Sequence, residues 1–414
     1  AALAFAVLLA LGGRDPALRP SEARAVAIVP LTADCGGAAP ASGARPRLVV
    51  AGVWAGAEAR RFAAVLARFA RRTGVEVTYA YETRNIAAKL EGRIERGCPP
   101  DVALLPQPGL LARLAREGRI QPLDPATAAT VRRHYGRTWR QLATVRGRAY
   151  GVWFKAAGKS SIWYRPGALR TAGVDRPPRS WPELLETARR LAAAGVRPFA
   201  VAGASPWTLT DWFENLYLRS AGPVPYQRLA EHRIRWTDPS VVRVLRQLAG
   251  LLSDRALVGL PGQALETSFE ESVDQVFGDR PEAAMVYEGD FVRSFLPPGA
   301  AHAAGAEARF FAFPGAVASG PPVAVVGGDV AVRLQACRDA LTRRAAAALA
   351  GADTVRFDLS DLQPPAFGAT AEQGMWEIFQ DFLADPSNPE ATARRLEAAA
   401  RAAWACERAI AGRC

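Results

Sequence analysis

Histidine, cysteine and serine supply most enzymatic nucleophiles and metal ligands, and here their spacing favours neither use. The three histidines, His134, His232 and His302, lie far apart in polar stretches. The chain has no GxSxG, HExxH or phosphate-loop motif, and its five cysteines include no CxxC pair. Catalytic triads and zinc sites need these residue types at close, fixed positions. We therefore expect no catalytic residue, no metal and no cofactor.

Asp211 and Glu214 are the carboxylate pair best placed for acid–base chemistry. They stand three residues apart in a stretch with helical character, residues 207–219, so both side chains fall on one face. Glycosidases instead need two carboxyl groups on opposite sides of the scissile bond. We therefore do not expect an enzyme, and a carbohydrate-active enzyme is kept as an alternative hypothesis.

Aromatic side chains alternate with charged or amide side chains at the expected ends of several elements. A sugar has C–H faces that stack on flat rings and hydroxyls that need hydrogen-bond donors and acceptors. Core packing is the alternative role for each ring, but rings beside charges are poor candidates for a dry core. The pattern favours a carbohydrate site. The rings are Trp54, Trp153, Trp207, Trp212 and Tyr287, and the polar neighbours are Glu58, Lys155, Asp211 and Glu288.

The elements that must position Trp54 and Glu58 alternate between strand and helix. Strands are expected at residues 48–50, 75–81 and 101–105, and helices at 58–72, 86–96 and 110–117. This alternation predicts a parallel sheet covered by helices. The turns after Val50, after Tyr81 and at 105–108 should therefore share the rim where such sheets bind ligands.

The second half of the chain is expected to mix aromatic strands with longer helices. Strands are expected at 150–154, 161–164, 198–201, 283–287, 310–313 and 322–326, and helices at 181–194, 207–219, 239–253, 343–350, 375–384 and 389–409.

Length and charge limit the classes of function. A chain of 414 residues suits two lobes of ordinary size. The net charge of +12 invites a nucleic-acid hypothesis, but the arginines are scattered and form no basic run with interleaved aromatics. Only Lys89, Lys155 and Lys159 are lysines. We therefore expect a solvated basic surface and no nucleic-acid partner.

The start of the chain favours export. Residues 1–11 are an apolar run too short to span a bilayer, which fits the core of a secretory signal, with a buried helix as the alternative. An unpatterned stretch rich in proline, glycine and alanine follows as far as Pro46. We expect an extracytoplasmic protein, secreted or associated with the cell surface.

Exported cysteines are expected to oxidise. Two disulfides and one free thiol are possible, and Cys406 and Cys414 are close enough in sequence to pair. Cys35 lies where a lipid-anchored cysteine would stand, but Asp34 occupies the place of a small residue, so the lipidation signal is poor. The remaining cysteines are Cys98 and Cys337.

Seven short motifs occur in a characteristic order. They are GCPPDVALLPQPG at 97–109, GRIQPLD at 118–124, YGVWFK at 150–155, SSIWY at 160–164, TDWFE at 210–214, VGGDVAV at 326–332 and FDLSDLQP at 357–364. Each motif is weak alone, and the order makes the match specific. Over residues 47–404 the chain resembles the extracellular solute-binding proteins of carbohydrate ABC transporters (family 1), especially the α-glucoside-type branch.

The resemblance implies an α/β fold of the periplasmic-binding-protein-like type II class. Two α/β lobes are joined by a hinge, which the chain crosses near 150–155 and 322–328. Residues 1–46 would be a signal or leader and a disordered linker. Lobe 1 would comprise 47–152 plus 327–345, and lobe 2 would comprise 153–326 plus 346–414.

The resemblance also implies a non-enzymatic receptor. It would capture a carbohydrate, such as an oligosaccharide or α-glucoside, between the lobes and deliver it to the permease subunits of an ABC importer. The protein would be a monomer, peripheral to the membrane. The sugar contacts that the family pattern carries over are Trp54, Glu58, Gln107, Lys155, Asp211, Trp212, Glu288 and Asp329.

One stretch departs from the family. After Val332 the family continues with a helix and a Gly-Gly-Phe-type loop that reaches the ligand, whereas here 333–340 leads directly into 341–344. A shorter connection suggests a more open pocket, a larger sugar or another role. A ligand-sensing protein that serves a membrane signalling partner is a further alternative, which the sequence does not separate from a transport receptor.

Overall fold

The protein divides into two compact units, and each is described by itself. Unit 1 consists of Ala1–Ala156, Gly328–Thr354 and Glu407–Cys414, and unit 2 consists of Ala157–Gly327 and Val355–Cys406. The sequence predicts that the chain passes between the lobes after residues 152, 326 and 345. In the structure the corresponding unit boundaries fall after residues 156, 327 and 354. The computed structural model describes residues 26–32, 47–83, 85–297, 308–315, 324–334, 356–368 and 374–411.

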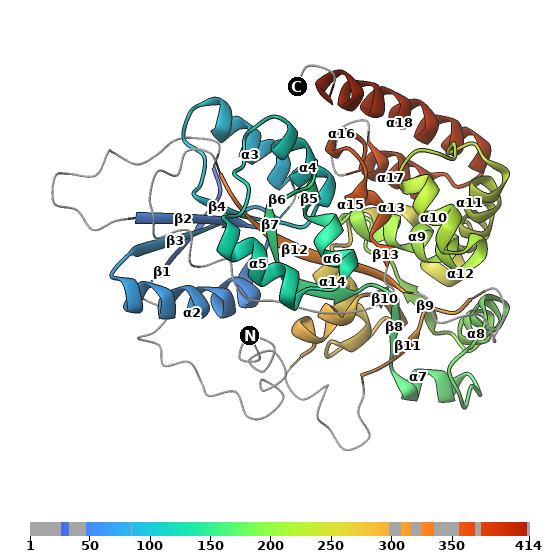
Figure 1. The fold of residues 1–414 in the computed structure, drawn as a ribbon. Coiled ribbons are helices and arrows are strands. Elements are labelled where there is room, and N and C mark those ends of the chain that lie inside the picture. Colours follow the sequence, from blue (N-terminus) through green and yellow to red (C-terminus); the bar gives the residue numbers. More distant parts are fainter. Residues whose placement is uncertain are drawn as a thin grey trace. The chain divides into compact units, whose positions relative to one another are not determined.

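Unit 1 is built on a mainly parallel sheet with the strand order β1-β3-β2-β4-β12 (Figure 1). Strands β1, β3, β2 and β4 run parallel, and β12 runs antiparallel to β4, with Val330 opposite Leu105. Strand β7 also pairs with β12. The strands are β1 Val26–Pro30, β2 Arg47–Gly52, β3 Glu76–Tyr81, β4 Val102–Leu105, β7 Gly151–Gly158 and β12 Val325–Arg333.

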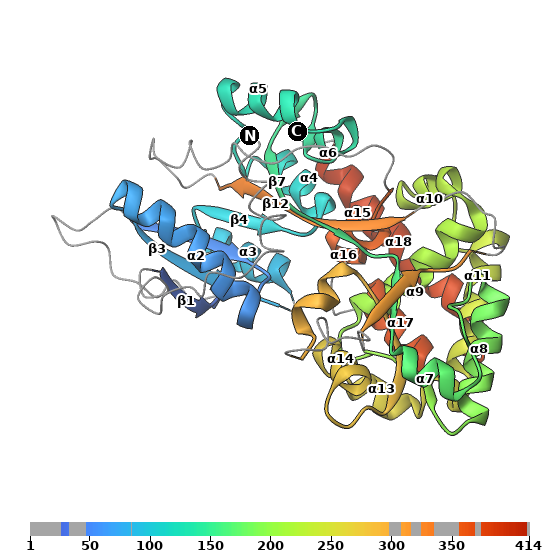
Figure 2. The same cartoon turned by 90° about the horizontal axis from the view of Figure 1, so that it is seen from below.

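Helices cover both faces of this sheet, with α2 on one face and α3 and α4 on the other (Figures 1 and 2). Helix α2 packs Phe62 against Tyr79 of β3, and it ends where Gly74 adopts a left-handed φ of 71°. The helices of unit 1 are α2 Gly56–Thr73, α3 Ile86–Glu95, α4 Pro108–Arg116, α5 Pro125–His134 and α6 Arg137–Leu142, and a hairpin of β5 Thr144–Val145 and β6 Arg148–Ala149 follows.

Strand β1 corrects the expectation that residues 1–46 hold only a leader and a disordered linker. Val26–Pro30 pairs in parallel with β3, and Val26 and Leu31 are buried. The segment is short and apolar, and its partner lies about fifty residues further along the chain, so no local repeat identifies it as a strand.

Unit 2 contains a four-stranded sheet with the order β11-β8-β10-β9. Strand β10 runs parallel to β9 and antiparallel to β8. The strands are β8 Ser161–Tyr164, β9 Arg197–Ala200, β10 Ala283–Glu288 and β11 Arg309–Ala312, and a short β13 Arg356–Phe357 pairs with the start of β12.

Helix α9 lies at the centre of unit 2, and every residue from Thr208 to Leu218 is buried. The helices of unit 2, of which α18 continues into unit 1, are α7 Pro166–Thr171, α8 Trp181–Ala193, α9 Trp207–Ala221, α10 Pro223–Ala230, α11 Pro239–Leu252, α12 Arg255–Val258, α13 Pro261–Glu266, α14 Phe269–Phe277, the 3₁₀ helix η3 Asp290–Phe295, α15 Leu359–Leu362, α16 Pro365–Gly368, α17 Met375–Ala384 and α18 Pro389–Ala411.

The cysteines differ in part from the expectation. Cys98 is disulfide-bonded, whereas Cys406 is a free, exposed thiol, so Cys406 does not form the disulfide with Cys414 that their spacing allows. Helix α18 continues to Ala411, and its rise of about 1.5 Å per residue carries the chain away from Cys406 instead of turning back.

Several sequence-based expectations lie outside the described residues. They concern the apolar run at 1–11, Cys35, Cys337, Cys414, the helix at 343–350 and the shortened connection after residue 334. Among the described residues, no helix combines the length and the hydropathy that a membrane span requires.

The chain passes between the units within β7 and β12, and Gly328 supports a close backbone approach there. A Cβ atom at Gly328 would overlap the backbone oxygen of Lys155, whereas a Cβ at Gly327 would meet only the flexible stem of Lys159, at 3.1 Å. We expect Gly328→Ala to destabilise the protein by about 1–3 kcal/mol, because a backbone atom cannot move aside as a side chain can. Urea unfolding measures this. Gly327→Ala is the matched control, and an equal loss in both variants would contradict the assignment.

Candidate functional site

The first cluster of predicted site residues lies in unit 1, beyond the carboxyl end of β2. Trp54 lies two residues beyond this strand, and Glu58 lies in the first turn of α2. The backbone N–H of Trp54 donates to the Tyr79 hydroxyl at 3.0 Å, and that hydroxyl donates back to the Trp54 carbonyl at 3.1 Å. Burial raises the pKa of Tyr79, which keeps it a neutral donor. Strands β2 and β3 therefore hold the turn that carries Trp54.

Four predicted site residues meet around the Trp54 ring. The indole Nε1 donates to Asp329 Oδ2 at 3.2 Å, which ties the turn to β12. The ammonium of Lys155, on β7, lies 5.3 Å from the centre of the ring and donates to Glu58 Oε1 at 2.9 Å. The side chains of Lys155 and Glu58 remain 27 % and 24 % exposed. The cluster therefore offers a cation and a carboxylate to solvent beside an aromatic ring.

Gln107 stands at the carboxyl end of the neighbouring strand β4. It is the residue before α4, and its side chain is 5 % exposed. Its Oε1 has no hydrogen-bond partner among the described residues. A buried amide oxygen without a partner is costly in a folded protein. Gln107 is therefore suited to a hydrogen bond that a ligand would complete.

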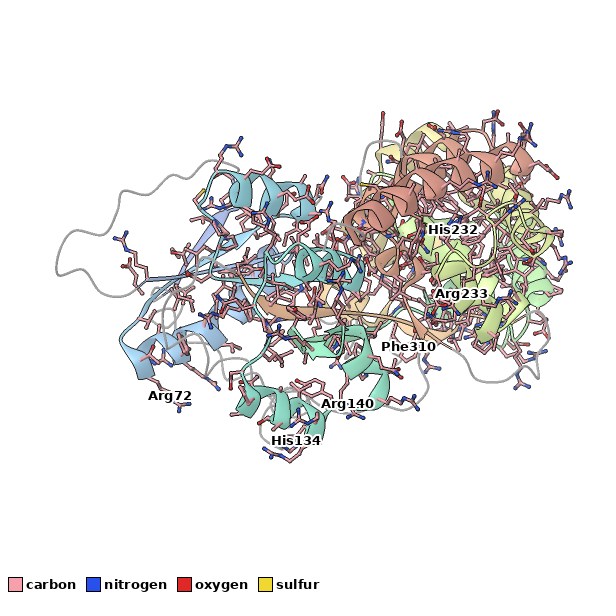
Figure 3. All side chains as sticks on the ribbon, turned by 45° about the horizontal axis from the view of Figure 1, so that its top comes forward. Arg72, His134, Arg140, His232, Arg233 and Phe310 are labelled. Atoms are coloured by element: carbon pink, nitrogen blue, oxygen red, sulfur yellow. The ribbon has the colours of Figure 1, made fainter. Side chains whose placement is uncertain are left out.

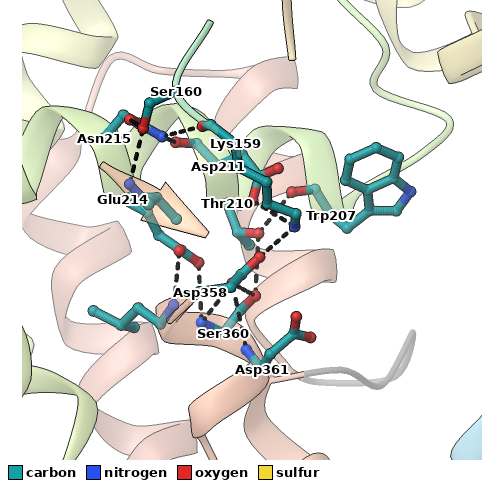
Figure 4. Close-up of polar contacts among 12 residues, drawn as sticks. Lys159, Ser160, Trp207, Thr210, Asp211, Glu214, Asn215, Asp358, Ser360 and Asp361 are labelled. Carbon is teal, nitrogen blue, oxygen red and sulfur yellow. Dashed lines mark hydrogen bonds and ion pairs between the residues drawn. The ribbon is translucent and has the colours of Figure 1, made fainter. Parts of the chain in front are cut away.

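The second cluster lies in unit 2 and is centred on Lys159, just after β7 (Figure 4). Its ammonium, whose side chain is 12 % exposed, donates to Asp211 Oδ1 on α9 at 3.1 Å and contacts Asp358 before α15. It also lies 5.2 Å from the centre of the Trp207 ring. The backbone carbonyl of Lys159 accepts from Asn215 at 2.8 Å and from the Tyr287 hydroxyl at 2.9 Å. One lysine therefore joins four segments of unit 2.

The carboxyl oxygens of Asp211, Glu214 and Asp358 lie within 4.8 Å of one another, a spacing that a metal ion can use. The ammonium of Lys159 already contacts two of these groups. Glu214 instead accepts from the backbone N–H groups of Leu359 and Ser360 and from the Tyr226 hydroxyl, at 2.7, 2.9 and 2.9 Å. The cluster is therefore held by a cation and donors of the protein itself.

Burial raises the pKa of these carboxyl groups, whereas the positive charge of Lys159 lowers it. Burial opposes the ionisation of Asp358, but the charge of Lys159 and several hydrogen bonds outweigh it and lower the pKa of Asp358 to about 2. Burial raises the pKa of Asp211 and of Glu214. For Lys159 the two neighbouring aspartates outweigh the burial and raise its pKa. Lys159 and Asp358 thus form the charged pair of the cluster.

Glu288, at the end of β10, is also brought next to Asp211. It is 1 % exposed, and neither of its carboxyl oxygens has a hydrogen-bond partner among the described residues. Burial, followed by the neighbouring Asp211 carboxyl, raises the pKa of Glu288 well above its ordinary value. Two buried carboxyl groups can form a hydrogen bond only when one carries a proton. The Asp211–Glu288 pair is therefore suited to hold a proton.

The structure does not support Trp212 as an exposed stacking platform. Its ring is 2 % exposed and is enclosed by Phe199, Tyr287 and Phe313, with ring centres at 5.5, 4.7 and 5.7 Å. The half-buried Trp207, at the start of the same helix, is the ring that lies beside the Lys159 cluster. The sequence pattern places Trp207 among the aromatic rings that favour a carbohydrate site, but the family resemblance does not include it among the sugar contacts.

Lys159 and Asp358 were not among the predicted site residues. Two sequence signals point to them. Lys159 is one of three lysines in an arginine-rich chain, and Asp358 belongs to the FDLSDLQP motif.

The raised pKa of Glu288 makes a testable link between pH and stability. The folded protein keeps this proton to a higher pH than the unfolded chain, so Glu288 lowers the free energy of unfolding as pH rises above about 4.3, the ordinary value for glutamate. Glu288→Gln cannot titrate, so we expect this variant to gain stability relative to the wild type between pH 4 and pH 8. Urea unfolding without ligand at several pH values measures this difference. The exposed Glu186→Gln is the control, and curves that stay parallel for Glu288→Gln and the wild type would contradict the prediction.

Comparisons with known proteins agree with this architecture. Residues 55–331 match the model of the bacterial extracellular solute-binding protein family. The osmoprotective compounds-binding protein GgtB of Synechocystis sp. is 30 % identical over 382 residues, covering 82 % of this chain and 89 % of that protein. The alpha-glucosides-binding periplasmic protein AglE of Rhizobium meliloti is 32 % identical over 279 residues, covering 64 % and 60 %.

Solved structures share the fold at low sequence identity. A chitin oligosaccharide binding protein superposes with a TM-score of 0.73 at 17 % identity, covering 87 % of this chain and 99 % of that one. Maltose-bound MalE3 of T. maritima superposes with a TM-score of 0.64 at 16 % identity, covering 86 % and 99 %. The predicted periplasmic-binding-protein-like α/β fold is confirmed. With the family match over most of the chain, these findings show that the protein belongs to the bacterial extracellular solute-binding proteins.

Proposed function

We propose that the protein captures a carbohydrate, an oligosaccharide or α-glucoside, and delivers it to the permease subunits of an ABC importer. The observation that carries this proposal is the cluster beyond β2 in unit 1. Lys155, Glu58 and the Trp54 ring lie together there and combine a half-buried donor, a half-buried acceptor and the 7 % of the Trp54 ring that remains exposed. Sugars need this combination of groups. The relative that is named for binding alpha-glucosides supports the same class of ligand.

The proposed contacts combine the predicted residues with one replacement. Glu58, Lys155 and Gln107 supply polar groups, Trp54 and Asp329 hold the turn that positions them, and Asp211 and Glu288 are proposed as further polar contacts. Trp207 replaces Trp212 as the stacking ring in unit 2. We propose that the receptor works extracytoplasmically as a monomer and without catalysis.

Titration calorimetry with a sugar panel tests the proposal. Maltose, trehalose and sucrose represent α-glucosides, cellobiose is the β-linked control, and chromatography of the recovered sugar checks for turnover. Stoichiometric binding of an α-glucoside without turnover is the expected result. Hydrolysed product would contradict a receptor, and no heat with any α-glucoside in the panel would contradict the proposed ligand class.

Lys155→Met tests the polar contact in unit 1. We expect the affinity for the bound sugar to fall about 10- to 100-fold, because a hydrogen bond from a charged donor contributes about 1.5–3 kcal/mol. Lys89→Met makes the same chemical change on α3 and should leave the affinity unchanged. Equal affinities of the two variants in calorimetry would remove Lys155 from the contact set.

Trp207→Ala and Trp212→Ala separate stacking from core packing. The buried Trp212 should cost about 3–5 kcal/mol of stability when truncated, with little change in the affinity of the folded protein. Trp207→Ala should weaken binding about tenfold, with a smaller loss of stability. Urea unfolding and calorimetry on both variants measure the two effects. Weaker binding by Trp212→Ala at full folding would restore it to the site.

A further inference from the structure

A strongly basic surface lies in unit 1 on α5, α6 and the β5–β6 hairpin. Residues 125–149 contain six arginines and no aspartate or glutamate, so this segment alone contributes six of the twelve net positive charges of the chain. We name this surface the arginine face. Its members are Arg132, Arg133, Arg137, Arg140, Arg146 and Arg148.

Aromatic anchors hold this segment to β7 and set its orientation. Val131, Tyr135 and Trp139 recur every four residues and are 4 %, 6 % and 5 % exposed. The Tyr135 hydroxyl donates to the Trp153 carbonyl at 2.9 Å, and the Trp153 indole donates to the Trp139 carbonyl at 2.7 Å. Because these anchors lie against β7, the arginines between them project elsewhere. Around His134 in Figure 3, nitrogen-tipped side chains extend away from α5.

Three exposed arginines of this face lack acidic partners. In the part of the chain that the structure describes, Arg132, Arg133 and Arg137 are exposed and form no ion pair, and Arg133 donates to the Thr130 hydroxyl at 3.4 Å. Three exposed arginines of unit 2 do form ion pairs. Arg176 pairs with Glu183, Arg246 with Glu390 and Arg395 with Asp381. Arg132, Arg133 and Arg137 therefore give the arginine face three positive charges that no acidic side chain of the described residues compensates.

The composition of the face favours one kind of partner. The large hydrophobic side chains that are exposed among the described residues are Val29, Val65, Val224, Leu260 and Phe310, and none lies within 125–149. A protein interface usually has an apolar or aromatic centre that carries most of the affinity. A layer of phosphate groups needs no such centre, because the planar guanidinium binds phosphate oxygens in pairs. We propose that the arginine face binds the anionic phospholipid headgroups of a membrane surface.

Vesicle flotation tests this proposal. The full-length protein is mixed with vesicles of phosphatidylglycerol and phosphatidylcholine, or of phosphatidylcholine alone, at 0.1 M and 1 M salt. Binding is expected to the anionic vesicles at 0.1 M salt and to disappear at 1 M, because salt screens exposed charges. Each basic side chain near an anionic surface raises partitioning about fivefold. Arg132→Gln/Arg133→Gln/Arg137→Gln should therefore lower partitioning roughly 100-fold.

The control variant is Arg176→Gln/Arg246→Gln/Arg395→Gln, which removes the same charge from arginines that face carboxylates and should reduce partitioning far less. Near-ultraviolet circular dichroism and sugar calorimetry show that both variants fold and keep the ligand site. Equal losses in the two variants, or no binding of the wild type to anionic vesicles at 0.1 M salt, would overturn the proposal. Tighter binding to double-stranded DNA than to the vesicles would reassign the face to nucleic acid, and binding only to an acidic protein would reassign it to a protein partner.

Discussion

The buried ammonium of Lys159 is the interaction on which unit 2 depends. It stands between Asp211 and Asp358, which lie 52 and 199 residues away along the chain. Leaving one member of such a buried pair without its partner costs about 3–5 kcal/mol, so each of the segments that meet here is constrained by the others. The low pKa of Asp358 and the raised pKa of Asp211 both follow from this arrangement, since one cation can balance only one buried carboxylate in full.

Lys155 plays the corresponding part in unit 1 with a different balance of burial. It has one carboxylate partner instead of two, and it keeps about a quarter of its side chain in solvent. Each lysine lies over a tryptophan ring, at 5.3 Å for Trp54 and 5.2 Å for Trp207. The exposed pair can exchange its partner for a ligand at small cost, whereas the buried pair is fixed by desolvation. The Lys155–Glu58 pair is therefore suited to binding a ligand, and Lys159 with its two aspartates is suited to stabilising unit 2.

Local sequence patterns were enough to predict the strands and helices that alternate over residues 48–117. The elements around Trp54 follow periods of two and 3.6 residues, and Gly74 ends helix α2. The sequence of helix α9 does not show which of its side chains are exposed, because the helix is buried on all sides and has no apolar stripe. The half-buried Trp207 could therefore not be distinguished from the core residue Trp212. Asp358 and β1 depend on partners that are distant in sequence, and no short-range pattern contains that information.

Lys155 lies on β7 and Lys159 follows the end of this strand, four residues further along, and this spacing has a genetic consequence. Successive residues of a strand face opposite sides, so a change of one residue in length reverses the side that the following residues face. Removal of a single codon between them would turn one lysine away from its carboxylates while leaving the other in place. Point substitutions affect one cluster at a time, but a length change in this short stretch couples them. Over evolution, Lys155 to Lys159 should therefore tolerate changes of side chain far better than changes of length.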